Sequence, residues 1–183
     1  MPKVVNHDEV RARLLDAGFR LLVEEGYAHA TMRRLAAAAG VSTGSLYHYF
    51  PDKQAILWEL FELTTGRDTE RIRATLPPDA PLDDRVRAMF DFYRGERSYL
   101  ADLLRLVLEV HRHEPAPASR QRVRDAMAAY RDAMASVLAL EPGVVGAAFS
   151  LLVGNLVQEV VDPSGVDVDA QERLALALAG VLG

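Results

Sequence analysis

Cysteine is absent from the 183 residues, and tryptophan occurs only once. Without cysteine the chain cannot form a disulfide, ligate zinc through thiolates or use a thiol nucleophile. The first residues also lack the apolar run and the small-residue cleavage site of a secretory signal, so we expect no signal peptide. This composition suits a reducing compartment, and we expect the protein to act in the cytoplasm.

A net positive charge is also missing, because the formal net charge is −5. The charge is unevenly distributed: residues 1–54 carry seven Lys or Arg against six Asp or Glu, and residues 55–183 carry fourteen against twenty. A slightly basic head on an acidic body indicates two parts with separate tasks. We therefore predict one domain over residues 1–54 and a second over residues 55–183.

Apolar residues recur at steps of three and four along almost the whole chain, and no segment alternates as a strand does. This pattern predicts an all-α protein of about nine helices. The expected helices cover about residues 8–25, 32–39, 43–50, 52–74, 83–95, 98–113, 118–140, 144–161 and 169–182.

The most informative stretch of the chain is residues 31–53. Two short helices joined by Gly40-Val41-Ser42 have helix-turn-helix spacing, and the alanines of the first helix let the second cross closely. The second helix would expose short, polar and aromatic side chains, which can meet phosphates and base edges in a major groove. An ordinary helical hairpin with a solvated face has the same spacing, so spacing alone leaves both interpretations open.

Over about residues 11–57 the sequence closely resembles the N-terminal DNA-binding domain of the TetR family of transcriptional regulators (TetR/AcrR type). The resemblance is densest at Thr31, Leu35-Ala36, Ala39-Gly40-Val41-Ser42, Gly44, Leu46-Tyr47, Tyr49-Phe50 and Lys53. It implies a three-helix helix-turn-helix DNA-binding domain, followed by a C-terminal helical domain for ligand binding and dimerisation.

The resemblance also implies which residues contact DNA. The candidates are Thr31, Arg33, Arg34, Thr43, Gly44, Ser45, Tyr47, His48, Tyr49 and Lys53. Among them Arg33 would approach a base edge, and Lys53 would hold a phosphate. Thr43 stands where many relatives have a basic residue and Arg34 where many have an acidic one, so we expect a different distribution of phosphate contacts.

In the body, the resemblance implies a pocket for a small hydrophobic or amphipathic inducer. Aromatic and apolar residues with a few polar groups are suited to line such a pocket. The candidates are Phe61, Phe90, Tyr93, Leu103, His111, Met127, Tyr130, Met134 and Asn155. Plain core packing is the alternative for each of them.

The function that the resemblance implies is a homodimeric repressor that binds a palindromic operator in double-stranded DNA and is released by its inducer. The alternative is a constitutive dimeric DNA-binding module without a small-molecule ligand. We expect no enzyme activity, because the chain shows no clustered acid–base pair, and we expect no cofactor.

Residues 144–161 are apolar apart from a few polar side chains, and Glu159 is their only charge. We expect no membrane span, because polar residues interrupt the run and basic flanks are missing. Instead, the two C-terminal helices should form the dimer seam as a four-helix bundle with the partner. The expected interface residues are Ala147, Leu151, Gly154, Leu174, Leu178 and Val181.

Two motifs imitate chemistry that we do not expect. Gly40-Val41-Ser42-Thr43-Gly44 fits the pattern of a hydrolase nucleophile elbow, but that motif needs a strand before its serine. We expect Ser42 to cap a helix instead. His111-x-His113-Glu114 suggests a metal site, but residues two apart on a helix point about 200° away from each other. We therefore expect no metal there.

Overall fold

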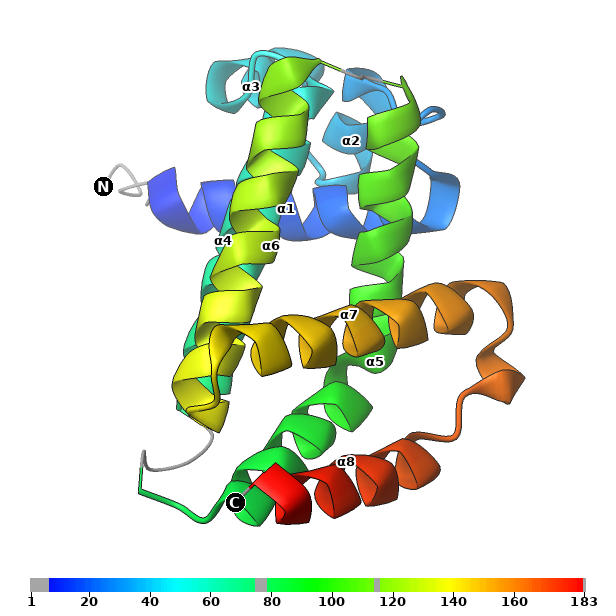
Figure 1. The fold of residues 1–183 in the computed structure, drawn as a ribbon. Coiled ribbons are helices and arrows are strands. Elements are labelled where there is room, and N and C mark those ends of the chain that lie inside the picture. Colours follow the sequence, from blue (N-terminus) through cyan, green and yellow to red (C-terminus); the bar gives the residue numbers. More distant parts are fainter. Residues whose placement is uncertain (1–6, 75–78, 114–115, 183) are drawn as a thin grey trace. The chain divides into compact units, whose positions relative to one another are not determined.

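The structure is a computed structural model that describes residues 7–74, 79–113 and 116–182. These residues form eight α-helices and one short 3-10 turn, and they contain no strand, as predicted for an all-α chain. Figure 1 labels α1 (His7–Glu25), α2 (Met32–Ala38), α3 (Thr43–Tyr49), α4 (Lys53–Arg73), α5 (Leu82–His113), α6 (Pro117–Leu138), α7 (Pro142–Val161) and α8 (Val168–Leu182), and the turn η1 spans Pro163–Gly165.

The chain divides into two compact units. The first contains the described residues up to Thr64 together with those of Leu106–Arg120, and the second contains those of Thr65–Arg105 and from Gln121 onward. Helices α4, α5 and α6 each contribute residues to both units. The predicted domain boundary after residue 54 falls within the first turn of α4.

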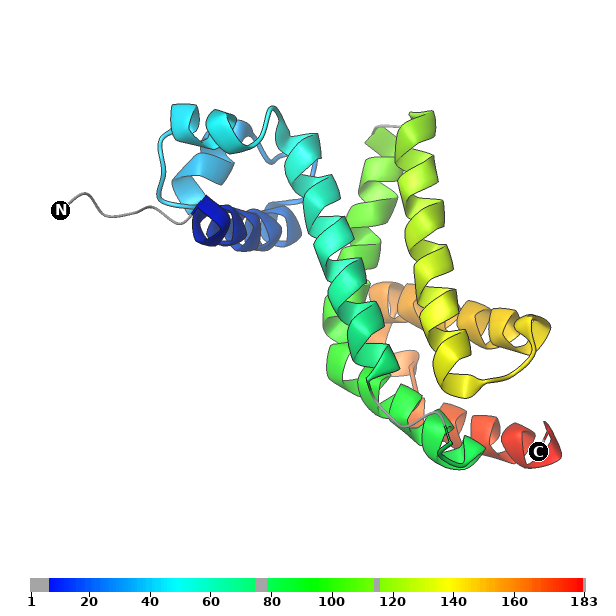
Figure 2. The ribbon, with the colours of Figure 1, turned by 90° about the vertical axis from the view of Figure 1, so that its left-hand side faces the viewer.

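The first unit is built around the apolar stripe of α1. Leu14, Leu15 and Leu22 are each at most 3% exposed, and their spacing puts them on one face of the helix. Asp52 caps the start of α4, because its Oδ1 accepts a hydrogen bond of 2.7 Å from the amide of Ala55. Figure 2 shows α1, α2 and α3 lying together as one group of helices.

The second unit has a core of its own, to which five helices contribute. Ile72 of α4, Met89 of α5, Met134 of α6, Val145 of α7 and Ala179 of α8 are all buried in it. Full burial of a Val, Leu, Ile or Met side chain contributes roughly 1.5–3 kcal/mol to stability. Packing within this core therefore holds the C-terminal helices together.

Helix α5 differs from the prediction, because one helix of 32 residues replaces the two that were expected over 83–95 and 98–113. The break was predicted at Gly95, which is exposed and lies inside the continuous helix. A glycine inside a helix costs about 1 kcal/mol relative to alanine, which is too little to stop a helix that is buried on one side. The segment also lacks a proline, which would remove a backbone hydrogen bond.

Candidate nucleic-acid interface and helical body

Helices α2 and α3 each begin with a side-chain cap. Thr31 Oγ1 accepts a hydrogen bond of 3.3 Å from the amide of Arg34, and Ser42 Oγ accepts one of 3.0 Å from the amide of Ser45. These caps satisfy amides that the first turn of a helix leaves without partners. The predicted role of Ser42 is confirmed, and helices on both sides of it do not form a nucleophile elbow.

A tight turn and a small core fix α3 against α2. Gly40 in the turn has a φ of +68°, a conformation that glycine adopts at little cost. Beneath the turn, Leu35, Leu46 and Phe50 are each at most 2% exposed. Val41, in the turn itself, is half-buried. The outer face of α3 is therefore held in a defined orientation.

That outer face carries most of the residues predicted to contact DNA. The exposed candidates are Thr31, Arg33, Arg34, Gly44, Ser45, Tyr47 and His48, and the half-buried ones are Thr43, Tyr49 and Lys53. Tyr47 is 53% exposed, which is unusual for a large aromatic side chain. Hydroxyl and imidazole groups of α3 are thus open to solvent, as are the guanidinium groups of α2, and such groups can donate hydrogen bonds to phosphates and base edges.

Two of the predicted cationic contacts have partners within the protein. The guanidinium of Arg34 pairs with the carboxylate of Glu25 at the end of α1. Lys53 Nζ donates to the backbone carbonyls of Tyr27 and Ala30 at 2.8 and 3.3 Å, and it lies 4.2 Å from the centre of the Tyr27 ring. The predicted phosphate contact of Lys53 would have to compete with these interactions.

A hollow of about 340 Å³ lies beside α3, and sequence reasoning missed it. It is lined by Val10, Leu14, Val41, Ser45, His48 and Tyr49. His7 Nδ1 lies 3.1 Å from the hydroxyl of Tyr49, which places the first turn of α1 next to the candidate interface. The two residues are 42 positions apart, and no pattern in the sequence links them.

The loop after α1 is held by a carboxylate that sequence reasoning also missed. Glu109 of α5 accepts hydrogen bonds from the amides of Tyr27 and Ala28 at 2.8 and 3.1 Å. Gly26, with a φ of +80°, turns the chain so that both amides face this carboxylate. Together with Lys53, which binds carbonyls of the same loop, Glu109 fixes the connection between α1 and α2.

Most of the residues predicted to line a ligand pocket are inside the protein. Phe61, Tyr93, Leu103 and Met134 are buried, and Phe90, Met127, Tyr130 and Asn155 are half-buried.

His111, however, is exposed in the last turn of α5, so its predicted inward position is wrong. The inward face of α5 runs through Leu106 and Val110, at 3% and 1% exposure. His111 is one position further along, which turns it about 100° away from that face.

Asn155 and Arg94 both join helices of the second unit. Asn155 of α7 and Gln171 of α8 exchange two amide hydrogen bonds at 2.7 and 3.0 Å. Arg94 of α5 donates to Asp169 of α8 at 2.9 Å and also pairs with Glu172. The amide of Asn155 therefore has a structural partner, which leaves it less suited to a ligand than the sequence suggested.

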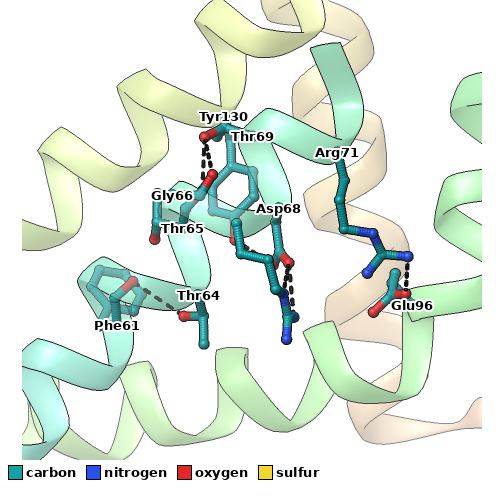
Figure 3. A network of polar contacts seen from close by, with 10 residues as sticks. Phe61, Thr64, Thr65, Gly66, Asp68, Thr69, Arg71, Glu96 and Tyr130 are labelled. Atoms are coloured by element: carbon teal, nitrogen blue, oxygen red, sulfur yellow. Dashed lines mark hydrogen bonds and ion pairs between the residues drawn. The ribbon is translucent and has the colours of Figure 1, made fainter. Parts of the chain in front are cut away.

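A carboxylate without any solvent exposure lies in α4. Asp68 is 0% exposed, and its Oδ2 accepts a hydrogen bond of 3.0 Å from the hydroxyl of Tyr130 on α6 (Figure 3). Its Oδ1 accepts two from the neighbouring Arg67, at 3.0 and 2.8 Å. Burial, and then the negative charge of Asp68, raises the pKa of the Tyr130 hydroxyl, which keeps this donor protonated.

A second buried acid lies on α7. Glu159 is 9% exposed, and its Oε2 lies 3.8 Å from Arg97 of α5, which is too far for a hydrogen bond. Burial, and then the nearby Glu159, raises the pKa of Tyr93, whereas Arg97 lowers it. Apart from Val145 this glutamate is the only buried residue among those of α7 that the structure describes. A charge thus faces inward on a helix whose apolar side chains are largely uncovered.

The residues predicted for a dimer interface lie on the outside of α7 and α8. Leu151, Leu174 and Leu178 are 69%, 62% and 53% exposed. Ala147 and Gly154 are exposed as well, and the side chain of Val181 lies outside the described residues. By length and composition α7 is also the one described helix that could cross a membrane, and 11% of its apolar stretch is buried.

The motif His111-x-His113-Glu114, which imitates a metal site, begins in the last turn of α5. His111 and His113 are both exposed, and Glu114 lies outside the described residues. Within the ranges that the structure describes, no group of three or more His, Cys, Asp or Glu side chains could hold a metal ion.

Comparison with known proteins identifies the helix-turn-helix region. The sequence model for bacterial regulatory proteins of the tetR family matches residues 14–60, which contain α2, the turn and α3. The chain is also 43% identical over 77 residues to an HTH-type transcriptional repressor from Mycobacterium tuberculosis, a match that covers 40% of this chain and 38% of that protein. The chain belongs to the TetR family.

Solved structures extend the likeness to the whole fold. A TetR transcription regulator from Haloarcula marismortui has a TM-score of 0.79 at 19% identity, and 95% of this chain and 98% of that chain are covered. The multidrug binding protein EbrR, solved with malachite green, has a TM-score of 0.71 at 21% identity, with 92% and 96% covered. At these identities the likeness shows the TetR-family fold alone. The chain spans 36–41% of the length of three curated regulators that it matches.

Proposed function

We propose that this TetR-family protein is a transcriptional repressor that binds a palindromic operator as a homodimer and releases it when a small hydrophobic or amphipathic inducer binds in the helical body. The observation that carries this proposal is the outer face of α3. It is polar and exposed, while the opposite face is fixed by Leu35, Leu46 and Phe50.

The chemistry of α3 suits a major groove. Ser45, Tyr47 and His48 present hydroxyl and imidazole groups that donate to phosphates and bases, and the absent side chain of Gly44 permits close approach to the backbone of DNA. Arg33, exposed at the start of α2, can place two donors on a guanine edge. These groups give α3 the role of a recognition helix.

Exposed leucines on α7 and α8 support a dimer. Soluble proteins seldom leave several large apolar side chains uncovered on neighbouring helices, because burying them releases about 25 cal/mol per Å². A second copy would cover Leu151, Leu174 and Leu178 and hold two recognition helices about 34–36 Å apart, one turn of DNA. Glu159 faces inward with Arg97 beside it, and a charge inside a bilayer is costly. A second protein copy is therefore favoured over lipid as the partner of these leucines. We therefore place the dimer in the cytoplasm.

Relatives support the regulatory details. The similar protein from Mycobacterium tuberculosis is a transcriptional repressor, and EbrR, which shares the fold, is a multidrug binding protein solved with malachite green. A comparable ligand in the body of this protein would shift the equilibrium between conformations of α4, a helix that contributes residues to both compact units.

Substitution of Arg33 tests the DNA interface. Sites selected from random duplex DNA serve as the operator, and fluorescence anisotropy measures its affinity. Arg33→Ala should weaken binding by about 1–3 kcal/mol and relax base choice at one position, because a bidentate base contact is lost. Arg87→Ala removes the same charge from an exposed position on α5 and serves as the control.

Wild-type affinity and base choice in Arg33→Ala would contradict this placement of the interface.

A thermal-shift screen of small hydrophobic compounds tests the inducer: a repressor of the proposed kind gains stability from compounds that also release the operator. Operator binding that no stabilising compound changes would instead support the constitutive module.

A further inference from the structure

Asp68 lies where a charge is costly. Its side chain is fully buried in α4, and a buried ion pair is often no more stabilising than apolar residues of the same volume. The main counter-charge is the neighbouring Arg67, whose side chain is 51% exposed. The ion pair itself joins successive residues of one helix, and its contacts with other helices are those of Asp68 with Tyr130 and of Arg67 with the ring of Tyr99.

The surroundings of the Arg67 guanidinium have the chemistry of a site for an organic cation. Asp68 supplies the carboxylate, and the ring of Tyr99 lies 4.9 Å from the guanidinium carbon. A carboxylate attracts guanidinium and ammonium groups through charge-assisted hydrogen bonds, and an aromatic face attracts them through its ring electrons. Asp68 is held in place from the other side by the Tyr130 hydroxyl, so the acceptor is already oriented (Figure 3).

Thr65 places a further polar group beside this carboxylate. It lies one helical turn before Asp68 and is 8% exposed. Its hydroxyl interacts with the hydroxyl of Tyr130 and lowers the pKa of Tyr130. Residues three apart share one face of a helix. The Thr65 hydroxyl and the buried carboxylate of Asp68 therefore both lie next to Tyr130, whose hydroxyl donates to Asp68.

We propose that the place filled by the Arg67 guanidinium is a binding site for a planar organic cation of the amidinium or guanidinium type. Arg67 fills it as an internal competitor. Its half-exposed side chain can turn into water, and an incoming cation then takes over the bond to Asp68 and the face of Tyr99. That such a cation binds here does not depend on the proposed function. That the cation acts as the inducer does rest on it.

Removal of the competitor tests the site directly. Benzamidine is the probe, because its amidinium has the planar donors of guanidinium, and benzamide is its neutral counterpart. Isothermal titration calorimetry on the full chain should show benzamidine binding to Arg67→Ala at least tenfold more tightly than to wild type. Benzamide should bind neither protein. The double variant Arg67→Ala/Asp68→Asn should lose the gain, with circular dichroism checking its fold.

Arg71→Ala is the matched control, since it removes an arginine from the same helix and breaks a different ion pair, the one with Glu96 (Figure 3). It should bind benzamidine as wild type does. The proposal is overturned if Arg67→Ala shows no gain, if Arg71→Ala gains equally, or if benzamide binds as tightly as benzamidine. The comparison of benzamidine with benzamide on Arg67→Ala tests the site even if the double variant does not fold. Operator affinity is measured separately, so calorimetry decides the cation site and anisotropy decides the proposed repressor.

Discussion

Lys53 shows how a residue at a DNA-binding position can also serve the fold. Its ammonium binds the carbonyls of Tyr27 and Ala30 and lies over the Tyr27 ring, which is 1% exposed. The hydrogen bonds satisfy acceptors in a loop that has no regular secondary structure of its own. A phosphate contact, as the resemblance implies, and a structural contact predict different results when the charge is removed.

Lys53→Met keeps the aliphatic stem and removes the charge. The structure predicts a loss of about 1.5–3 kcal/mol in the free energy of unfolding, because a charged donor to two carbonyls disappears. Urea denaturation measures this loss. If instead stability is unchanged and the salt dependence of operator binding falls by about one unit, Lys53 acts mainly on a phosphate.

At the scale of elements, the connection between α1 and α2 depends on a turn that only glycine makes easily. Gly26 and Gly40 both have a positive φ, but their surroundings differ. A Cβ on Gly40 would meet nothing within 4 Å, whereas one on Gly26 would lie 3.1 and 3.2 Å from the carboxylate oxygens of Glu109. The two positions therefore separate the cost of the backbone conformation from the cost of displacing Glu109.

Gly40→Ala should destabilise the protein by about 1 kcal/mol, because alanine disfavours positive φ. Gly26→Ala should destabilise it more, since Glu109 must also move away from its two amides. Urea denaturation of both variants, each repeated in a Glu109→Ala background, measures the difference. In that background the two losses should converge. Equal losses in the presence of Glu109 would show that the carboxylate adapts without cost.

At the scale of the whole molecule, the uncovered leucines of α7 and α8 make the oligomeric state the property to test. Leu178→Asp should shift the protein toward monomer, because an unpaired charge buried in an interface costs several kcal/mol. Operator affinity should fall steeply while the helical circular dichroism stays.

Sedimentation measures the shift for Leu178→Asp. Leu108→Asp is its control, because Leu108 on α5 is 52% exposed, against 53% for Leu178, and lies outside the predicted interface. A Leu178→Asp protein that dimerises like wild type would place the interface elsewhere.

Local features of this fold were predictable from the sequence, and distant pairings were not. The caps at Ser42 and Asp52 and the buried Leu46 follow from residue type and spacing, which act within a few positions. The hydrogen bond between Asp68 and Tyr130 joins residues 62 apart, and such a pair leaves no local periodicity. Likewise, the continuity of α5 through Gly95 depends on packing, which outweighs the propensity of one residue.

Glu109 recognises the loop after α1 through backbone amides alone, and this has a consequence for how the sequence can change over evolutionary time. Every residue except proline carries an amide hydrogen, so position 28, an exposed alanine, can drift among nearly all side chains without loss of its bond to the carboxylate. Position 109 has no such freedom, because only a carboxylate of that length receives both amides. Mutational tolerance should therefore be high on one side of this contact and low on the other.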